Sequence, residues 1–252
     1  MSAGVRMTAP GSAPLLEVED LTMRFGMVTA AEGETVTLSP GEFVGIVGPN
    51  GAGKTTFLNL VTGYLRPQRG RIRFQGRDIT GMRPAEIVTL GIGRSFQIPQ
   101  LFLSLTVLEN VLVALAAAEG RTLRPGDPLH RPERARAGLE VLQRFALADD
   151  AERPASALPE GGRKLLDIAM AFALRPRLLL MDEPTSGVSA EEKFVVMDTL
   201  VPVLRAAGVT AVFVEHDLEV VRRYAGRVLV LDAGRIVADG PPDAVLAPRS
   251  EA

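Results

Sequence analysis

The chain has no cysteine, no excess of positive charge and no long apolar run, and each absence narrows what it can be. Without cysteine, disulfides and thiolate metal sites are excluded. The formal net charge of −2 argues against a broad nucleic-acid-binding surface, so we expect no nucleic-acid partner. The longest apolar candidate for a membrane span, Val111 to Ala118, is far shorter than the ~18 residues that a spanning helix needs.

The chain divides by composition into segments of different character. Residues 1–14 carry glycine, serine and proline without the apolar stretch of a signal peptide, and we expect a disordered lead-in there. Strand-like runs and a phosphate-loop pattern follow, so 15–98 is expected to form a β-subdomain and part of an α/β core. Residues 99–175 favour a helical subdomain. Residues 176–252 are expected to complete the core and end in a hairpin.

The residues from Gly48 to Thr55 match the phosphate-binding pattern G-x-x-x-x-G-K-[ST] at every defined position. The context also fits, because the run 42–47 predicts a buried strand and the run 56–61 predicts a helix. Glycines in such a loop let successive backbone N–H groups turn toward phosphates. The predicted nucleotide-binding residues are Gly48, Pro49, Asn50, Gly51, Ala52, Gly53, Lys54, Thr55 and Thr56.

Two carboxylates at the end of another apolar run, 177–183, are candidates for the chemistry. Ligands of a doubly wound α/β sheet collect at the carboxyl ends of its strands, which places Asp182 and Glu183 near the phosphate loop. There Lys54 would reach the β- and γ-phosphates, and Thr55 would give a hydroxyl to Mg²⁺. Asp182 is then a candidate partner of Mg²⁺, and Glu183 a candidate general base for the attacking water.

Three more residues are candidates by position. His216 follows the apolar run 209–215 and could hold the γ-phosphate or the water, while Gln97 ends an extended segment and could touch Mg²⁺ or that water. Phe25 could offer a ring on which a base stacks, although an ordinary core position explains its spacing equally well. Each has a structural alternative when taken singly. Together with the phosphate loop and in this order, they favour a hydrolytic site.

The sequence also predicts the positions of individual strands and helices. Residues 15–21 predict an edge strand, with 35–38 as its hairpin neighbour. A capping-box pattern at Thr106 and Glu109 predicts the start of an apolar helix. Another helix is expected over about 133–146. Its apolar face would consist of Leu139, Leu142 and Phe145.

In combination, these motifs resemble the nucleotide-binding subunits of ABC transporters over about Leu15 to Leu246. The resemblance rests on the runs GPNGAGKTT, LPEGGRKLLDIAMAFAL, LLLMDEPTSG and VFVEHD, with Gln97 after the first. The segment GIGRSFQIPQLFLSLTVLENVLVAL and the helical insert are similar to the ATPase subunits of branched-chain amino-acid importers. The resemblance implies an α/β P-loop NTPase fold with a mostly parallel core sheet, an antiparallel β-subdomain and a helical subdomain.

The resemblance also implies roles. Phe25 would stack on adenine, Gln97 would face both the nucleotide and the membrane subunit, Glu183 would be the catalytic carboxylate and His216 the switch histidine. ATP and Mg²⁺ are the implied ligands. The implied partners are integral-membrane permease subunits, a second ATPase subunit and, indirectly, a periplasmic or extracellular solute-binding protein. The chain would work at the cytoplasmic face of the cell membrane, on a solute chosen by other subunits, with amino acids, amides and small carboxylates all open.

One segment departs from the family pattern. The signature usually reads L-S-G-G-Q, and residues 158–162 here read L-P-E-G-G. Pro159 replaces the serine that would donate a hydroxyl to the partner's γ-phosphate, and Glu160 adds a negative charge. Gly161 and Gly162 can still offer backbone N–H groups at a helix start. The resemblance implies a head-to-tail dimer, in which each ATP lies between the phosphate loop of one subunit and the signature of the other. The altered signature would therefore weaken the site that holds the partner's ATP. We expect a heterodimer with a second, different ATPase subunit, and a homodimer is the alternative.

Some alternatives stay open. The stretch 99–105 is apolar directly after Gln97, which fits either a permease-docking groove or plain subdomain core. A soluble ABC protein acting on nucleic acid or ribosomes would usually carry tandem ATPase units or a long coiled-coil insert, and this chain has neither. A non-hydrolysing regulatory subunit is suggested by Pro159, but Glu183 and His216 weigh against it. The Asp-Glu pair, the histidine and the helical insert do not fit a P-loop kinase or GTPase.

Overall fold

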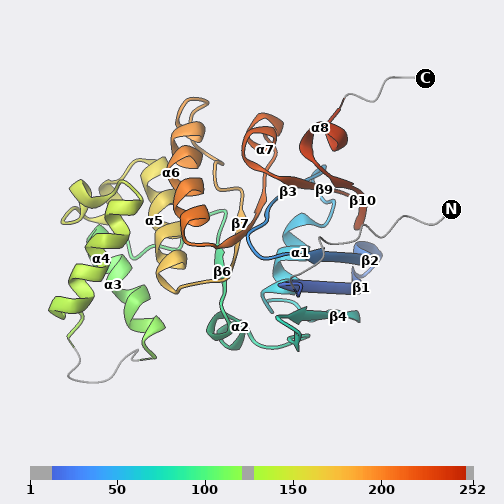
Figure 1. Cartoon of the computed structure of the whole chain (residues 1–252), viewed down its shortest axis with the longest axis horizontal. Coiled ribbons are helices and arrows are strands. Elements are labelled where there is room, and N and C mark those ends of the chain that lie inside the picture. The colour runs from blue at the N-terminus through green and yellow to red at the C-terminus, as the bar shows by residue number, and fades with distance from the viewer. Residues whose placement is uncertain (1–12, 121–127, 248–252) are drawn as a thin grey trace.

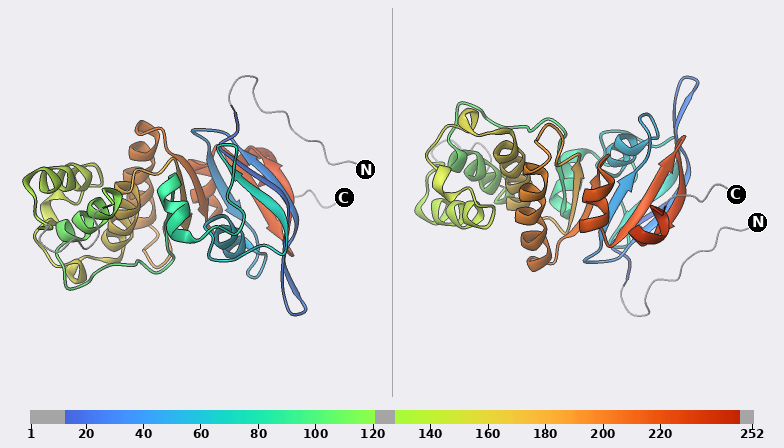
Figure 2. Two further views of the ribbon diagram at one scale, coloured as in Figure 1. Left: turned by 90° about the horizontal axis from the view of Figure 1, so that it is seen from below. Right: turned by 90° about the horizontal axis from the view of Figure 1, so that it is seen from above.

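The structure is a computed structural model that describes residues 13–120 and 128–247. The predicted lead-in over 1–14 lies almost entirely outside these residues. Figure 1 shows two β-sheets gathered toward one end of the molecule and a group of helices at the other. The two further views in Figure 2 show the same separation.

The core sheet is mostly parallel, as the sequence predicts. Its strands are β3 (Phe43–Val47), β6 (Ile92–Ser95), β7 (Leu178–Asp182), β8 (Thr210–Val214), β9 (Arg227–Asp232) and β10 (Arg235–Gly240). They lie in the order β10-β9-β3-β8-β7-β6. Every pairing from β9 to β6 is parallel, whereas β10 pairs antiparallel with β9 as the predicted C-terminal hairpin. The carboxyl ends of the parallel strands therefore meet at one edge of the sheet.

The central strands of this sheet are buried on both faces. In β7, Leu179 and Met181 belong to the core shared with the helices, whereas Leu178 and Leu180 belong to the core shared with the second sheet. Burying each such side chain contributes roughly 1.5–3 kcal/mol. An uninterrupted apolar run is what a strand needs when both of its faces are covered.

The second sheet is antiparallel and corrects one prediction. Its strands are β1 (Leu16–Phe25), β2 (Val28–Leu38), β4 (Arg69–Phe74) and β5 (Arg77–Asp78). They lie in the order β2-β1-β4-β5, so the prediction of an edge strand over 15–21 is wrong: β1 pairs with a neighbour on each side. Alternation along a strand reports that one face is buried, but it carries no information about which hydrogen-bonding edges are paired.

The helices cover the sheets and build the far end of the molecule. They are α1 (Lys54–Val61), α2 (Pro84–Leu90), α3 (Val107–Ala118), α4 (Pro132–Arg144), α5 (Glu160–Ala173), α6 (Glu192–Ala206), α7 (Leu218–Tyr224) and α8 (Pro242–Val245), with 3₁₀ turns at Ala148–Asp150 and Ala155–Ala157. Helix α1 contacts both β2 and β7, so it lies between the two sheets. Helices α3, α4 and α5 pack on one another (Figure 1). The treatment of 99–175 as a separate subdomain stays a prediction.

No helix within the described residues combines the length and the apolar character that a bilayer span requires.

The predicted start of α3 is confirmed, and the predicted face of α4 is partly wrong. Thr106 Oγ1 accepts from the Glu109 amide at 3.1 Å, and Glu109 Oε2 accepts from the Thr106 amide at 2.8 Å. In α4, Leu142 is buried, as is Phe145 just after the helix, but Leu139 is 43% exposed. The buried line runs instead through Gly138, where a Cβ would come within 2.8 Å of a leucine of α3. Because glycine does not contribute to an apolar pattern, the predicted buried face includes Leu139 in place of its neighbour Gly138.

Candidate functional site

The phosphate loop joins the end of β3 to the start of α1. Gly48, Gly51 and Gly53 have φ angles of 152°, 79° and 106°, which disfavour residues with a side chain. A Cβ at Gly48 would lie 2.1 Å from the Leu231 carbonyl oxygen, and one at Gly53 would lie 2.2 Å from the Ala30 carbonyl oxygen. The loop therefore forms a tight curl at a helix N-terminus, where anions are favoured.

The ammonium of Lys54 lies inside this curl. The side chain is largely buried, and Nζ donates to the Gly48 carbonyl at 2.7 Å and to the Pro49 carbonyl at 2.9 Å. Burial lowers the pKa of Lys54, while the carboxylates of Glu183 and Asp182 oppose this. A cation held at the mouth of a glycine loop is placed to meet a phosphate.

Two oxygen groups that suit a hard cation meet at the end of β7. Asp182 is buried, and the Thr55 hydroxyl hydrogen-bonds to its carboxylate. Burial raises the pKa of Asp182, and Arg94, 3.1 Å away, opposes this. Within 13–120 and 128–247, no cluster of three acidic or imidazole side chains forms a metal cage. The pair of oxygens therefore suits Mg²⁺ completed by water and phosphate oxygens rather than a metal held by protein alone.

The structure brings Glu183, Gln97 and His216 together, as the sequence predicts. Glu183 Oε2 accepts from Gln97 Nε2 at 2.8 Å, and Glu183 Oε1 lies 2.8 Å from His216 Nε2. The backbone of Glu183 has a φ of 50°, a left-handed conformation that a non-glycine residue seldom adopts. This turn directly after β7 aims the carboxylate toward the ends of β6 and β8. Strain of this kind concentrates at functional sites.

A buried carboxylate that sequence reasoning missed connects two of these loops. Glu215 Oε1 accepts from the Thr185 amide at 2.9 Å and from the Thr185 hydroxyl at 2.7 Å. Burial raises the pKa of Glu215, and the bonds from Thr185 oppose this. The loop after Glu183 is thereby tied to the residue that precedes His216. The only sequence signal was a charged residue at the end of an apolar run.

Most of the other predicted nucleotide contacts are exposed. Phe25 is 47% exposed at the end of β1, so the core alternative for it is wrong and its ring is available for stacking. Pro49, Asn50 and Thr55 are exposed, and Thr56 is half-buried. Ala52 is buried within the loop.

Comparison with known proteins identifies the class. A family model described as ABC transporter matches residues 32–186. The chain belongs to the ABC transporter family. The high-affinity branched-chain amino acid transport ATP-binding protein LivG of Escherichia coli K12 is 34% identical over 93% of this chain and 94% of its own length. The corresponding protein BraF of Pseudomonas aeruginosa is 34% identical, with the same two coverages.

Solved structures agree with this assignment. A nucleotide-free ATP-binding cassette from an ABC transporter is 31% identical, with a TM-score of 0.82 over 94% of this chain and 96% of that chain. An ATP-binding cassette in its ADP conformation, 30% identical, also has a TM-score of 0.82. These matches confirm the predicted fold, family and ATPase class.

The signature segment of this ABC ATPase lies away from its own phosphate loop. Figure 1 shows α5 among the helices at one end and α1 between the sheets. Pro159 is the N-cap of α5, and Glu160, its first residue, pairs with Arg163 at 3.0 Å. Gly161 is buried and Gly162 is half-buried. Helix α5 therefore lies apart from the phosphate-loop helix α1, although its first turns approach the loops that follow β6 and β7.

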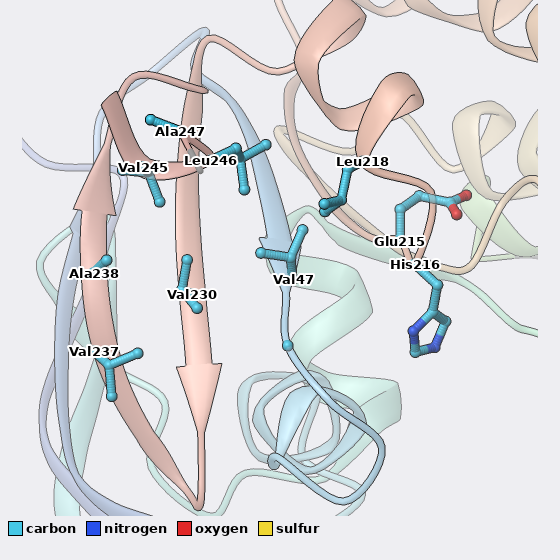
Figure 3. Close-up of a pocket in the computed structure, with 11 residues that line it drawn as sticks. Val47, Glu215, His216, Leu218, Val230, Val237, Ala238, Val245, Leu246 and Ala247 are labelled. Carbon is cyan, nitrogen blue, oxygen red and sulfur yellow. The ribbon is translucent and has the colours of Figure 1, made fainter. Parts of the chain in front are cut away.

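An apolar cavity of about 440 Å³ adjoins the site on another side (Figure 3). Gly48 and His216 line it together with apolar residues such as Val47, Val230 and Leu246. An apolar wall does not suit a triphosphate. We therefore place the phosphates at the loop itself.

Proposed function

We propose that this chain binds ATP with Mg²⁺ and hydrolyses it, with Glu183 as general base, to drive an importer of branched-chain amino acids. The observation that carries the proposal is the position of the Glu183 carboxylate, which lies between Gln97 Nε2 and His216 Nε2 at 2.8 Å from each. Gln97 follows β6 and His216 follows β8, the two strands that flank β7. A carboxylate in this setting is oriented before substrate arrives, which is what general-base catalysis requires.

The phosphate loop supplies binding and charge. Lys54 would exchange its bonds to the Gly48 and Pro49 carbonyls for bonds to the β- and γ-phosphates. Backbone N–H groups from Gly51 to Thr56 would surround the phosphates at the N-terminus of α1. Phe25 would hold the adenine by stacking on its exposed ring.

The metal is assigned to Thr55 and Asp182, whose hydroxyl and carboxylate already meet. Mg²⁺ bound there would neutralise charge on the phosphates. Gln97 would contact the metal or the water while keeping its bond to Glu183. Glu183 would take the proton of the attacking water, and His216 would hold the γ-phosphate from the opposite side.

The resemblance to ABC ATPases supports a head-to-tail pair, in which a second ATPase subunit would present its signature at this phosphate loop. Gly161 and Gly162 would then serve the partner's ATP. Permease subunits would dock near Gln97 and hold the pair at the cytoplasmic face of the membrane, with a solute-binding protein supplying solute from the other side. The branched-chain amino acid assignment rests on LivG and BraF.

The test is Glu183→Gln, compared with the parent chain in the assembled transporter. The amide keeps the shape of the site but cannot accept a proton, so ATP affinity should stay and turnover should fall by roughly 10²-fold or more. Lys54→Ala is the contrasting variant, because it should lose ATP affinity itself. Turnover of Glu183→Gln within about threefold of the parent would exclude Glu183 as the base.

A further inference from the structure

The ammonium of Lys164, on helix α5, is buried against the backbone of the catalytic loops. The residue is 3% exposed. Its Nζ donates to the Gln97 carbonyl, to the Ser186 hydroxyl at 3.0 Å and to the Glu183 carbonyl at 3.3 Å. Gln97 and Glu183 are also the two residues whose side chains bond each other. One side chain from the helical end therefore holds the main chain of both members of this pair.

Asp167, one turn further along α5, holds the same segment from a second point. It is buried, and its two carboxylate oxygens accept from the Phe96 amide at 3.1 Å and from the Gln100 amide at 2.9 Å. Together with Lys164, this fixes three backbone groups over 96–100. Charge-assisted bonds to backbone groups are among the stronger hydrogen bonds.

The burial of Lys164 has a cost that charge around it offsets. Burial lowers the pKa of Lys164, and nearby carboxylates, led by Glu160 and Asp167, oppose this. An ammonium removed from water is stable only when acceptors and counter-charges surround it. The three acceptors and the acidic neighbours meet that condition, so the arrangement is specific rather than an incidental surface contact.

The helix that carries Lys164 begins at Glu160, inside the signature segment and four residues earlier. The segment that it holds continues into Phe102 and Leu103, whose side chains are 50% and 49% exposed. Lys164 thus lies between three parts of the molecule: the signature end of α5, the exposed apolar surface after Gln97, and the backbone of Glu183.

We infer that Lys164 is a positioning residue, which makes the start of α5, the 96–100 segment and the Glu183 backbone move as one unit. It acts through the backbone of Gln97 and Glu183, whose carbonyls accept from its ammonium. A displacement of the 96–100 segment, for example by a docked permease, would shift the carboxylate and the signature end together. The inference rests on the proposed function for its effect on turnover, but the backbone contacts stand apart from it.

The test is Lys164→Met, which keeps the unbranched buried stem and removes the ammonium. Because Lys164 does not contact the phosphate loop, ATP affinity should stay within about twofold of the parent, whereas kcat should fall roughly a hundredfold through misplacement of Glu183. Lys164→Arg restores a cation with fixed donors and should recover part of kcat. The matched control is Lys193→Met, since Lys193 pairs with Asp217 and Glu219 instead and should leave kcat near the parent value.

Amide hydrogen exchange supplies a readout that does not depend on turnover. The Phe96 and Gln100 amides donate to Asp167, so loss of the ammonium acts on them through greater motion of the 96–100 segment. Their exchange should become about tenfold faster relative to Lys193→Met. If Lys164→Met does not fold, Lys164→Gln, which keeps an uncharged NH₂ donor group, takes its place in both measurements. If the parent proves inactive, the proposed function fails, while exchange still tests whether Lys164 holds the backbone of the 96–100 segment. Faster exchange with unchanged kcat, or unchanged exchange, would overturn the inference.

Discussion

Arg94 and Asp182 form an ion pair of 3.1 Å whose side chains are only 7% and 6% exposed. Arg94 also donates to Asn59 Oδ1 and to Thr62 Oγ1, both on α1 or at its end. Its guanidinium lies 5.0 Å from the Phe96 ring centroid. One buried cation thus braces the proposed metal carboxylate against β6 and against the helix of the phosphate loop.

Removing that cation should be costly. Arg94→Met leaves Asp182 buried without its counter-charge, so the free energy of unfolding should fall by about 3–5 kcal/mol, measured by urea denaturation. The loss should be smaller near pH 5 than near pH 8. Without Arg94 the folded-state pKa of Asp182 lies further above its unfolded value, so stability is retained where the carboxyl is protonated and is lost as pH rises through that folded pKa.

The control for this prediction is Arg69→Met. Arg69 pairs with Asp20 at 2.9 Å, but both side chains are well exposed. An exposed pair contributes about 0–1 kcal/mol, so this variant should unfold close to the parent. Equal losses for the two variants would mean that the buried pair has no special role.

The apolar surface after Gln97 should be required for docking. Phe102→Asp combined with Leu103→Asp places two charges on exposed positions, so co-purification with the permease subunits should be lost while the melting temperature changes little. The backbone there is held separately, because Asn110 bonds to both the amide and the carbonyl of Phe102. Leu139→Asp, on exposed α4, is the matched control and should keep co-purification. Retention by the double variant would exclude this surface.

Pro159→Ser tests whether the signature limits activity. A hydroxyl donated to a charged phosphate contributes about 1.5–3 kcal/mol, so its return should raise hydrolysis by the purified chain roughly tenfold to a hundredfold. The parent chain alone should be a poor ATPase, and an assembly with a different partner subunit should be faster. Rapid hydrolysis by the parent alone, unchanged in Pro159→Ser, would contradict the expectation of an asymmetric pair.

Glu34 predicts a pH dependence of stability. Its carboxylate on β2 is 2% exposed, and neither oxygen has a hydrogen-bond partner among the described residues. Burial raises the pKa of Glu34 to about 8. The folded state therefore keeps the proton that the unfolded chain loses near pH 4.5, so stability falls as pH rises between these values.

Glu34→Gln should remove this dependence. The neutral amide should raise the urea midpoint near pH 8 and change it much less near pH 4, where the parent is protonated in both states. Glu32→Gln is the control, because the Glu32 side chain is 36% exposed and pairs with Arg235 at 3.0 Å. A similar gain from both variants at both pH values would show that burial of Glu34 is not the cause.

The parts of the site that lie within continuous motifs could be predicted from sequence. The phosphate loop and the Asp182–Glu183 pair sit at the ends of uninterrupted apolar runs, and strand ends of a parallel sheet must converge. The convergence of Gln97 and His216 on Glu183 follows from the same geometry.

The contacts that bridge distant segments could not be predicted in this way. In the sequence, Arg94 is an ordinary charged residue in an extended segment, and Lys164 is one of several polar residues on an amphipathic helix. The residues that bind each of them are distant in the chain, so the sequence gives no sign of these contacts. The neighbours of β1 depend on how the sheet assembles. Gly138 lies at the contact between α3 and α4 because it has no side chain, so no apolar residue in the sequence indicates that contact. Whether a charged side chain is buried depends on the tertiary structure.

Asp182 lies opposite Val214 in the parallel pairing of β7 and β8. The geometry of the proposed catalytic residues therefore depends on this strand register. Glu183 and His216 each follow the end of their strand, and the Glu183 amide bonds to the Val214 carbonyl at 3.0 Å. A slip of one residue between β7 and β8 would turn every side chain of the slipped strand to the opposite face and separate the carboxylate from the imidazole. A chain that hydrolyses ATP would therefore also have β7 and β8 in the correct register, because the two residues proposed to act in the reaction directly follow these strands.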